Sequence, residues 1–305
     1  MTDTGKISTL AIHPGALGDV ILFARLLELL PHPVAVVTGG EKAKVLEGLG
    51  VVERAFAFES LAMHEVFTDG PIEKCSLASG PIRSCDRVVS CFGGDDQRSR
   101  QRLAPLFGAG ECSFLPIRPE NEYPGHLVDL WREMLKVESP VSRHPWPVPP
   151  EWITRTLPPS SALLQPGSGG RDKCWPLDSF IKLARGLERC GHNPVFILGP
   201  AEMERLHYRQ MLLMEGFEIV TCPSLKTLCG MLASCRVYIG NDSGVSHLAG
   251  VLGARCVVLF GASCPRHFAP IGPRVKIISG RKLDDMSPDA VLGAVARYSS
   301  LGGIE

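Results

Sequence analysis

The sequence predicts an α/β fold built from parallel sheets and divided into two domains. Short apolar runs alternate with longer helical patterns throughout the chain, which is typical of strand–helix–strand units. The chain of 305 residues is also longer than one hydrophobic core usually serves. Seven prolines crowd residues 140–159, where neither a regular helix nor a central strand can run. We therefore expect two domains that face each other across a cleft, joined by this linker.

Apolar runs and proline positions predict the elements of the first half. Three runs read as buried strands, at residues 8–13, 34–38 and 87–92. Residues 19–30 read as a mostly buried helix, because Arg25 and Glu28 are its only polar residues after Asp19. Pro31 ends that helix, since proline cannot continue it.

The second half shows the same alternation. Its strand candidates are residues 162–165, 194–198, 236–240 and 256–260. Its helix candidates are residues 180–190 and 201–213. A last helix over residues 288–299 is indicated by Ser287 as N-cap and Pro288 at the first helical position. We expect domains at residues 1–150 and 151–286, followed by a C-terminal helical segment at residues 287–305.

Charge and cysteine content exclude several classes of protein. Lys plus Arg and Asp plus Glu both number 32, so no net field favours nucleic acid or anionic lipid. The 11 cysteines form no Cys-x-x-Cys pair and have no matching histidine spacing, so we expect reduced thiols and no metal site. No apolar run approaches the roughly 18 residues of a membrane span, and the first residues do not resemble a signal peptide. These features predict a cytoplasmic protein.

The first chemical motif is His-Pro-Gly-Ala-Leu-Gly-Asp at residues 13–19, which runs from a strand into a helix. Gly15 and Gly18 permit a tight turn and a close approach of a ligand to the backbone. The motif is not a dinucleotide fingerprint, because its third glycine is missing and Asp19 would repel a phosphate. Asp19 is either a first-turn acid that stabilises the helix or a carboxylate that takes a proton from an attacking hydroxyl.

A glycine-rich loop at residues 166–170 forms the second motif, followed by Arg171 and Lys173. Ser168, Gly169 and neighbouring amides can donate to phosphate oxygens, and Lys173 can neutralise their charge. The spacing is not that of a Walker loop. An ordinary polar loop remains the alternative.

The third motif, Gly-Asn-Asp-Ser-Gly-Val-Ser-His at residues 240–247, reads as strand, polar turn and helix. Free amides and the helix dipole at such a terminus attract phosphate. Asp242 stands beside that anion site, and His247 lies one turn into the helix. An ordinary N-cap with a buried histidine is the alternative. Three glycine-bearing turns favour a ligand site, because α/β folds bind ligands at the carboxyl ends of strands.

Two weaker signals accompany these motifs. Glu202 follows a strand and starts a helix, where it either bonds ribose hydroxyls or favours the helix dipole. Arg98, Arg100 and Arg102 either contact an anionic acceptor or form a solvated basic helix face.

Together the motifs resemble glycosyltransferase family 9, the ADP-heptose:lipopolysaccharide heptosyltransferases. Members carry Gly-Asp near the N-terminus, here Gly18-Asp19, and Lys-x-Trp-Pro after a small-residue loop, here at residues 173–176. Their C-terminal signature Asp-Ser/Thr-Gly-x-x-His is here at residues 242–247, before a strand that ends Leu-Phe-Gly at residues 259–261. The order of the motifs agrees over nearly the whole chain.

The resemblance implies a GT-B type α/β fold, with two Rossmann-like domains whose parallel sheets face each other across a cleft. It implies a nucleotide sugar in the C-terminal domain, an acceptor in the N-terminal domain and a last helix that crosses back to the latter. Asp19 would be the general base, and Lys173 would stabilise the leaving diphosphate. The implied donor contacts are Ser168, Gly169, Lys173, Glu202, Asp242, Ser243, Gly244 and His247. The candidate acceptor contacts are His13, Arg98, Arg100 and Arg102.

The implied activity is an inverting transfer of heptose from ADP-heptose to a lipopolysaccharide-core or related envelope glycan, without metal or cofactor. The partners would be the nucleotide sugar and a glycolipid acceptor at the inner membrane surface, and no nucleic acid. A relative that binds a nucleotide sugar without transferring it is one alternative, and a nucleotide-sugar epimerase of the same fold is another. Asp19 and Lys173 together favour the transferase, and Lys-x-Trp-Pro argues against the epimerase.

Overall fold

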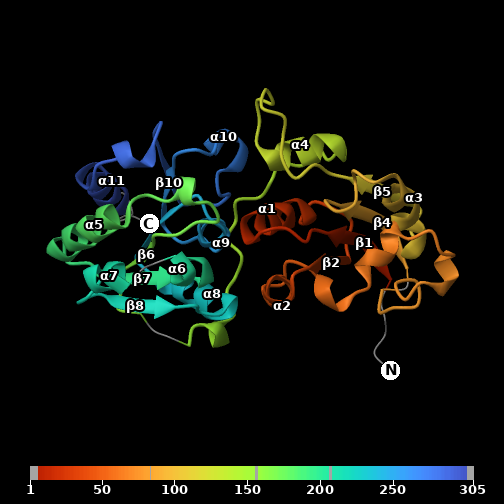
Figure 1. The fold of residues 1–305 in the computed structure, drawn as a ribbon, viewed down its shortest axis with the longest axis horizontal. Helices are drawn as coiled ribbons and strands as arrows, with labels where there is room; N and C mark the ends of the chain where they lie inside the picture. Colours follow the sequence, from red (N-terminus) through yellow and green to blue (C-terminus); the bar gives the residue numbers. More distant parts are fainter. Residues whose placement is uncertain (1–5, 83, 155–156, 206–207, 301–305) are drawn as a thin grey trace. The chain divides into compact units, whose positions relative to one another are not determined.

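The computed structural model describes residues 6–82, 84–154, 157–205 and 208–300. The chain divides into two compact units, Met1–Ser142 and Arg143–Glu305 (Figure 1). The division falls near the start of the proline-rich segment. Each unit contains one sheet in which every described strand pair is parallel.

The first unit is built on a five-stranded sheet in the order β3-β2-β1-β4-β5. Its strands are β1 (Ile7–Ile12), β2 (Val34–Thr38), β3 (Arg54–Ala57), β4 (Cys85–Ser90) and β5 (Glu111–Phe114). Its α-helices are α1 (Leu17–Leu27), α2 (Gly40–Gly48), α3 (Gln97–Leu106) and α4 (Leu127–Met134). Short 3-10 helices are η1 (Phe58–Ser60), η2 (Met63–Phe67) and η3 (Ile72–Lys74).

The second unit is built on a six-stranded sheet in the order β11-β10-β9-β6-β7-β8. Its strands are β6 (Ser161–Gln165), β7 (Asn193–Leu198), β8 (Glu218–Thr221), β9 (Val237–Asn241), β10 (Cys256–Phe260) and β11 (Val275–Ser279). Its α-helices are α5 (Leu177–Arg189), α6 (Pro200–Arg205), α7 (Tyr208–Leu213), α8 (Leu225–Ser234), α9 (Gly244–Val251), α10 (Pro265–Phe268) and α11 (Pro288–Ser300). Short 3-10 helices are η4 (Pro150–Trp152), η5 (Arg171–Lys173) and η6 (Leu283–Asp285).

Both sheets reverse their strand order once, and each reversal marks a place for a ligand. In the first unit the chain builds outward from β1 to β3 and then returns to the other side with β4. In the second unit it builds from β6 to β8 and returns with β9, which pairs with β6 in the register Leu164↔Ile239. Ligands of open α/β sheets bind outside the carboxyl ends of strands at such reversals. The reversals therefore lie at β1/β4 and β6/β9.

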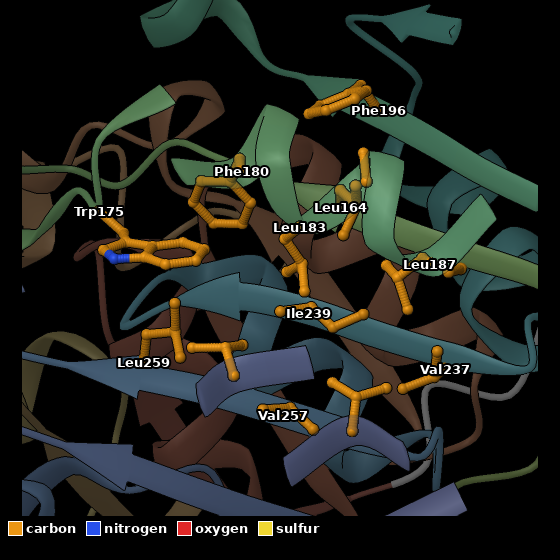
Figure 2. Close-up of a cluster of buried hydrophobic side chains, with 14 of the residues drawn as sticks. Leu164, Trp175, Phe180, Leu183, Leu187, Phe196, Val237, Ile239, Val257 and Leu259 are labelled. Atoms are coloured by element: carbon orange, nitrogen blue, oxygen red, sulfur yellow. The ribbon is translucent and has the colours of Figure 1, made fainter. Parts of the chain in front are cut away.

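One large core holds the second unit together. Alternate residues of the central strands point to the same face of a sheet, and there they pack under α5 and α11. Trp175, which precedes α5, is buried against Phe180 with ring centroids 5.0 Å apart. Its indole Nε1 donates to the carbonyl of Met286 at 3.1 Å. Figure 2 shows this cluster, with labels on Leu164, Trp175, Phe180, Leu183, Leu187, Phe196, Val237, Ile239, Val257 and Leu259.

The last helix, α11, packs within the second unit. Its Val291 and Val295 are buried in the same core, and its partner helix is α5. These apolar side chains give α11 a face to bury against α5. The predicted start is observed, because the amide of Ala290 donates to Ser287 Oγ at 3.2 Å.

The predicted strands all occur, with ends that shift by no more than two residues. The predicted helix at residues 201–213 is two helices, α6 and α7, and residues 206–207 of that prediction lie outside the described residues. The strands that were not predicted are the sheet edges β3, β5, β8 and β11. In the described part of the chain, no helix combines the length and the apolar character that crossing a membrane requires.

Candidate functional site

The candidate site lies in the second unit, where three turns leave the carboxyl ends of β6, β7 and β9. The turn after β6 spans residues 166–176 and leads into α5, the turn after β7 leads into α6, and the turn after β9 leads into α9. β6 and β9 are the two strands at the reversal of the sheet. The side chains that the sequence singled out in this half are therefore brought to one edge.

Asp242 is the electrostatic centre of this edge. Its buried carboxylate accepts hydrogen bonds from Lys173 Nζ at 2.8 Å and Ser263 Oγ at 2.5 Å, both through Oδ2. His247 Nε2 lies 3.8 Å from Oδ1. Burial alone would raise the pKa of Asp242, but His247, Lys173 and Ser263 outweigh it and hold that pKa well below its usual range. Asp242 is therefore ionised at neutral pH and fixes the ammonium of Lys173 in the site.

The hydroxyls of Ser168 and Ser243 tie the turns together. Ser168 Oγ donates to the carbonyl of Asp242 at 2.5 Å, which joins the turn after β6 to the turn after β9. Ser243 Oγ donates to Gln165 Oε1 at 2.8 Å and accepts from the amide of Ser246, so it caps α9. Both side chains are buried. These two hydroxyls therefore hold the turns together. A phosphate at this edge would be bound by backbone amides and not by the two hydroxyls.

A cavity of about 350 Å³ opens beside this network. It is lined by parts of residues 166–177, by α6 and by Gln210 of α7. Glu202 is buried in its wall, and Oε2 accepts from the amide of Gly199 at 2.6 Å. A Cβ at Gly167 would lie only 1.4 Å from Glu202 Oε1, so a glycine is required there for this close approach. The volume suits a small ligand of nucleoside size.

The N-terminus of α9 adds positive potential to the edge. Gly244 begins the helix directly after Asp242 and Ser243, and amides of a first helical turn point outward without intrahelical partners. His247 is buried one turn further on, and among the described residues its Nδ1 has no hydrogen-bond partner. Together with Lys173, whose side chain is 33% exposed, these groups can bind an anion.

In the first unit, Asp19 lies in the first turn of α1, directly beyond the carboxyl end of β1. Its side chain is half-buried. Burial is the main influence on the pKa values of His13, Lys42 and Cys91, and the nearby charge of Asp19 contributes an increase to each of them. The position at the β1/β4 reversal is where a ligand of this unit would bind.

The comparisons with known proteins point to one family. The profile described as Glycosyltransferase family 9 (heptosyltransferase) matches residues 153–289, which contain all three turns of the site. Lipooligosaccharide heptosyltransferase 2 of Campylobacter jejuni is 31% identical over 115 residues, which cover 36% of this chain and 35% of that protein. The corresponding protein of Haemophilus influenzae is 30% identical over the same length, 33% of its own. Over residues 153–289, this chain is similar to glycosyltransferase family 9.

Solved structures extend the likeness of fold to nearly the whole chain. The structure of E. coli ADP-heptose LPS heptosyltransferase II covers 98% of this chain and 100% of its own, with a TM-score of 0.76 and 18% identity. E. coli heptosyltransferase WaaC with ADP covers 96% and 100%, with a TM-score of 0.73 and 19% identity. The two parallel sheets and the likeness to these structures confirm the predicted GT-B fold. By sequence, the chain spans about a third of the length of the curated relatives it matches.

Three further residues of the candidate site were not predicted. Asn241 is buried, accepts from the amide of Trp175 at 3.0 Å and donates to the carbonyl of Pro166 at 2.8 Å. Arg205 donates to the carbonyls of Ser168 and Gly169, both at 2.9 Å. Ser263 completes the group around Asp242. A usable signal existed for Arg205, because it lies one helical turn after Glu202.

The candidate acceptor residues do not form one group. His13 is buried and its Nδ1 accepts from the amide of Gly15 at 3.1 Å. Arg98 forms an exposed ion pair with Asp69 at 2.9 Å. Arg100 and Arg102 donate to the carbonyls of Gly94 and Gly70, respectively. His13 and Arg102 therefore serve the scaffold of the first unit, while Arg98 is accessible. Among the described residues, no cluster of His, Cys, Asp or Glu could hold a metal ion.

Proposed function

We propose that this protein is an inverting glycosyltransferase that transfers heptose from ADP-heptose to a lipopolysaccharide-core or related envelope glycan. The observation that carries the proposal is the group of Lys173, Asp242 and His247 at the N-terminus of α9, inside the region that matches the family. Two similar structures support the choice of donor, since they contain E. coli heptosyltransferase WaaC with ADP and with ADP-2-deoxy-2-fluoro heptose.

The second unit supplies the donor contacts in this proposal. Residues 151–286 would bind the nucleotide sugar, with the nucleoside in the cavity beside Glu202 and Gly167. The diphosphate would lie at the start of α9, where amides, His247 and Lys173 meet it. Lys173 is partly exposed and its ammonium has three protons to donate, so it could bind a phosphate oxygen while it stays paired with Asp242. Asp242 would then anchor the donor indirectly, by holding Lys173 and His247 in reach.

The first unit supplies the base in this proposal. Residues 1–150 would bind the acceptor, and the carboxylate of Asp19 would take the proton of its attacking hydroxyl. The hydroxyl oxygen forms a bond to the anomeric carbon, while the bond from that carbon to the diphosphate oxygen breaks. The electron pair leaves with the diphosphate, and Lys173, His247 and the helix amides stabilise its growing charge. One displacement inverts the anomeric configuration and needs no covalent intermediate.

A glycolipid is the acceptor that this reaction implies, so we propose that the protein works at the cytoplasmic face of the inner membrane. Lipopolysaccharide and lipooligosaccharide heptosyltransferases among the relatives support that class of acceptor.

The test is incubation of the full chain with ADP-, UDP- and GDP-sugars and a bacterial lipid extract, with nucleotide release and lipid mass followed together. We expect ADP release and a lipid mass gain of one heptose from ADP-heptose alone. Binding of ADP-heptose without release from any lipid extract would favour the non-transferring alternative. Transfer from another sugar nucleotide would overturn the choice of donor.

Two variants connect this assay to the site. Lys173→Met should lower the rate of ADP release by about 10²-fold or more, because the leaving charge loses its cation. Lys182→Met, an exposed lysine on α5, is the matched control and should behave as the wild type. Full activity in Lys173→Met would contradict the role assigned to this edge.

A further inference from the structure

The Gly15 peptide, between β1 and α1, is held from both ends. The amide of Gly15 donates to His13 Nδ1 at 3.1 Å. The carbonyl of Gly15 accepts from Lys42 Nζ at 2.5 Å, and Lys42 comes from the first turn of α2. Two side chains from different elements therefore hold one peptide group of the turn that leads to Asp19.

His13 is a rigid support for this peptide. Its ring is 1% exposed and lies between Phe23 and Trp131, with ring centroids 5.3 and 6.5 Å away. Burial lowers the pKa of His13 to about 4, so the ring is neutral near pH 7. A neutral ring that accepts through Nδ1 carries its proton on Nε2. A Cβ at Gly15 would lie 2.5 Å from His13 Cε1, so the ring fits only against a glycine.

Lys42 connects the turns after the first three strands. It is half-buried, and the carboxylate of Glu59, which follows β3, accepts from the amide of Gly40 beside it at 2.9 Å. Burial lowers the pKa of Lys42, and the charges of Glu59 and Asp19 oppose that effect. The ammonium of Lys42 thus bridges the β1 turn to the β2 turn, within electrostatic reach of the carboxylates of Glu59 and Asp19.

The start of α1 depends on these contacts, because it has no side-chain cap. Ala16 is the N-cap residue and offers no hydroxyl or carboxylate to the first turn. The direction in which α1 leaves the sheet is therefore fixed by what holds residue 15. Asp19 is only four residues further on, in the first turn.

We propose that His13 and Lys42 are positioning residues, which hold the Gly15 peptide from its two ends and so fix the place of the Asp19 carboxylate. This inference rests on the proposed role of Asp19 as the base. It assigns His13 to the positioning of that base and not to contact with the acceptor. A displacement of a reacting group by about 1 Å can cost about 10²-fold in rate.

Lys42→Met and His13→Leu test the proposal, with the donor and acceptor that the sugar-nucleotide panel identifies. Each should lower kcat by about 10- to 10²-fold and leave KM for the donor nearly unchanged, because the second unit is untouched. Lys42→Arg and His13→Asn keep a donor and an acceptor in place and should recover most of kcat. Lys44→Met, exposed on the same helix, is the matched control.

An Asp19→Asn background separates positioning from general damage. Because both residues act through Asp19, adding Lys42→Met or His13→Leu to Asp19→Asn should reduce the residual rate no further. A further loss there, or wild-type kcat in both single variants, would overturn the proposal while leaving Asp19 as the base. Wild-type activity of Asp19→Asn itself would instead overturn the proposed role of Asp19.

Amide hydrogen exchange gives a readout that needs no substrate. Protection of the Gly15 amide should fall in His13→Leu and persist in His13→Asn, while the thermal midpoint of unfolding reports whether each variant folds. If Gly15 keeps its protection in His13→Leu, the peptide is not held by the ring and the proposal fails.

Discussion

The two units use the same device, a turn at the reversal of a parallel sheet, but they surround their acidic residue differently. In the second unit Asp242 is buried and bonded to Lys173 and Ser263, with His247 close by. In the first unit Asp19 is half-buried, and within the described residues its carboxylate accepts no hydrogen bond and forms no ion pair. The carboxylate of Asp242 is thus paired within the protein, whereas the carboxylate of Asp19 remains open to a ligand.

That difference supports the different tasks that the proposed function gives to the two acids. A carboxylate whose pKa is held far below its usual range is a poor base, because it does not accept a proton at neutral pH. It is well suited to orient cations around a leaving diphosphate. A carboxylate whose surrounding turn is held by its neighbours, while its oxygens stay accessible, can receive a proton from a substrate. In the proposed reaction, the chain would thus separate charge stabilisation from proton transfer.

The largest expected effect comes from Asp19→Asn. Loss of the base should lower kcat by about 10²- to 10⁴-fold. The free energy of unfolding should fall by less than about 1 kcal/mol, which is the size of a helix-dipole contribution. Transfer kinetics and urea unfolding measure the two, with nucleotide binding expected to persist. Asp289→Asn, an exposed first-turn acid of α11, is the control for the dipole effect. If kcat were equal in Asp19→Asn and in the control variant, Asp19 would not be the base.

Asp242→Asn should differ from Asp19→Asn by a large loss of stability. Neutralising a buried carboxylate leaves Lys173 and His247 without their counter-charge and should cost about 3 kcal/mol at pH 7. Asp178→Asn, an exposed first-turn acid of α5, should cost little. Urea unfolding followed by tryptophan fluorescence measures both variants.

The same variant gives a pH dependence with a definite sign. The pKa of Asp242 is lowered in the folded protein, so its contribution is fully present above the unfolded pKa of about 3.9 and is lost as pH falls toward the folded value. The stability gap between wild type and Asp242→Asn should therefore stay constant from pH 7 to 5 and shrink below pH 4. A gap that grows on acidification would contradict an ionised, paired Asp242.

Substitutions of the turn glycines give the next smaller effect. Gly167→Ala would place a methyl group 1.4 Å from Glu202 Oε1 and should cost about 1–3 kcal/mol through overpacking. Gly169→Ala in the same turn has no atom within 4 Å of the new Cβ, so its free energy of unfolding should change little. Thermal unfolding separates the two. Equal destabilisation would mean that Glu202 moves freely and is not part of a formed cavity wall.

The sequence predicts the centre of each sheet better than its edges. Central parallel strands are covered on both faces, so they appear as continuous apolar runs such as residues 256–260. The edge strands β3, β5, β8 and β11 are mostly half-buried or exposed, and their mixed composition hides them. The sequence likewise predicts which turns form the site, because the carboxyl ends of parallel strands meet at one edge of a sheet.

The contacts within the site are less predictable than its location. Asn241 and Arg205 bond to backbone carbonyls of a turn that lies far away in the sequence, and no local pattern encodes such partners. Ser168 illustrates the same limit, because its hydroxyl matches a phosphate-binding pattern but donates to the carbonyl of Asp242. Residue type at a turn therefore predicts the chemistry available there, while long-range packing decides which atoms remain for a ligand.

The smallest expected effect is on the free energy of unfolding, and it distinguishes two arginines of α3 in the first unit. Arg102 donates to the carbonyl of Gly70 at 2.6 Å and contacts Cys75 Sγ at 3.2 Å, so Arg102→Met should lower the free energy of unfolding by about 1 kcal/mol. Arg98 pairs with Asp69 at the surface, and Arg98→Met should change it by less than about 0.5 kcal/mol.

An accessible arginine whose ion pair costs little to break is the one that an anionic acceptor can recruit. Arg98→Met should therefore raise KM for the acceptor severalfold at unchanged kcat, while Arg102→Met should act through stability alone. Steady-state kinetics at varied acceptor, combined with thermal unfolding, distinguishes the two. If Arg98→Met leaves KM unchanged, the basic face of α3 is only solvated, and the acceptor of the first unit is recognised without it.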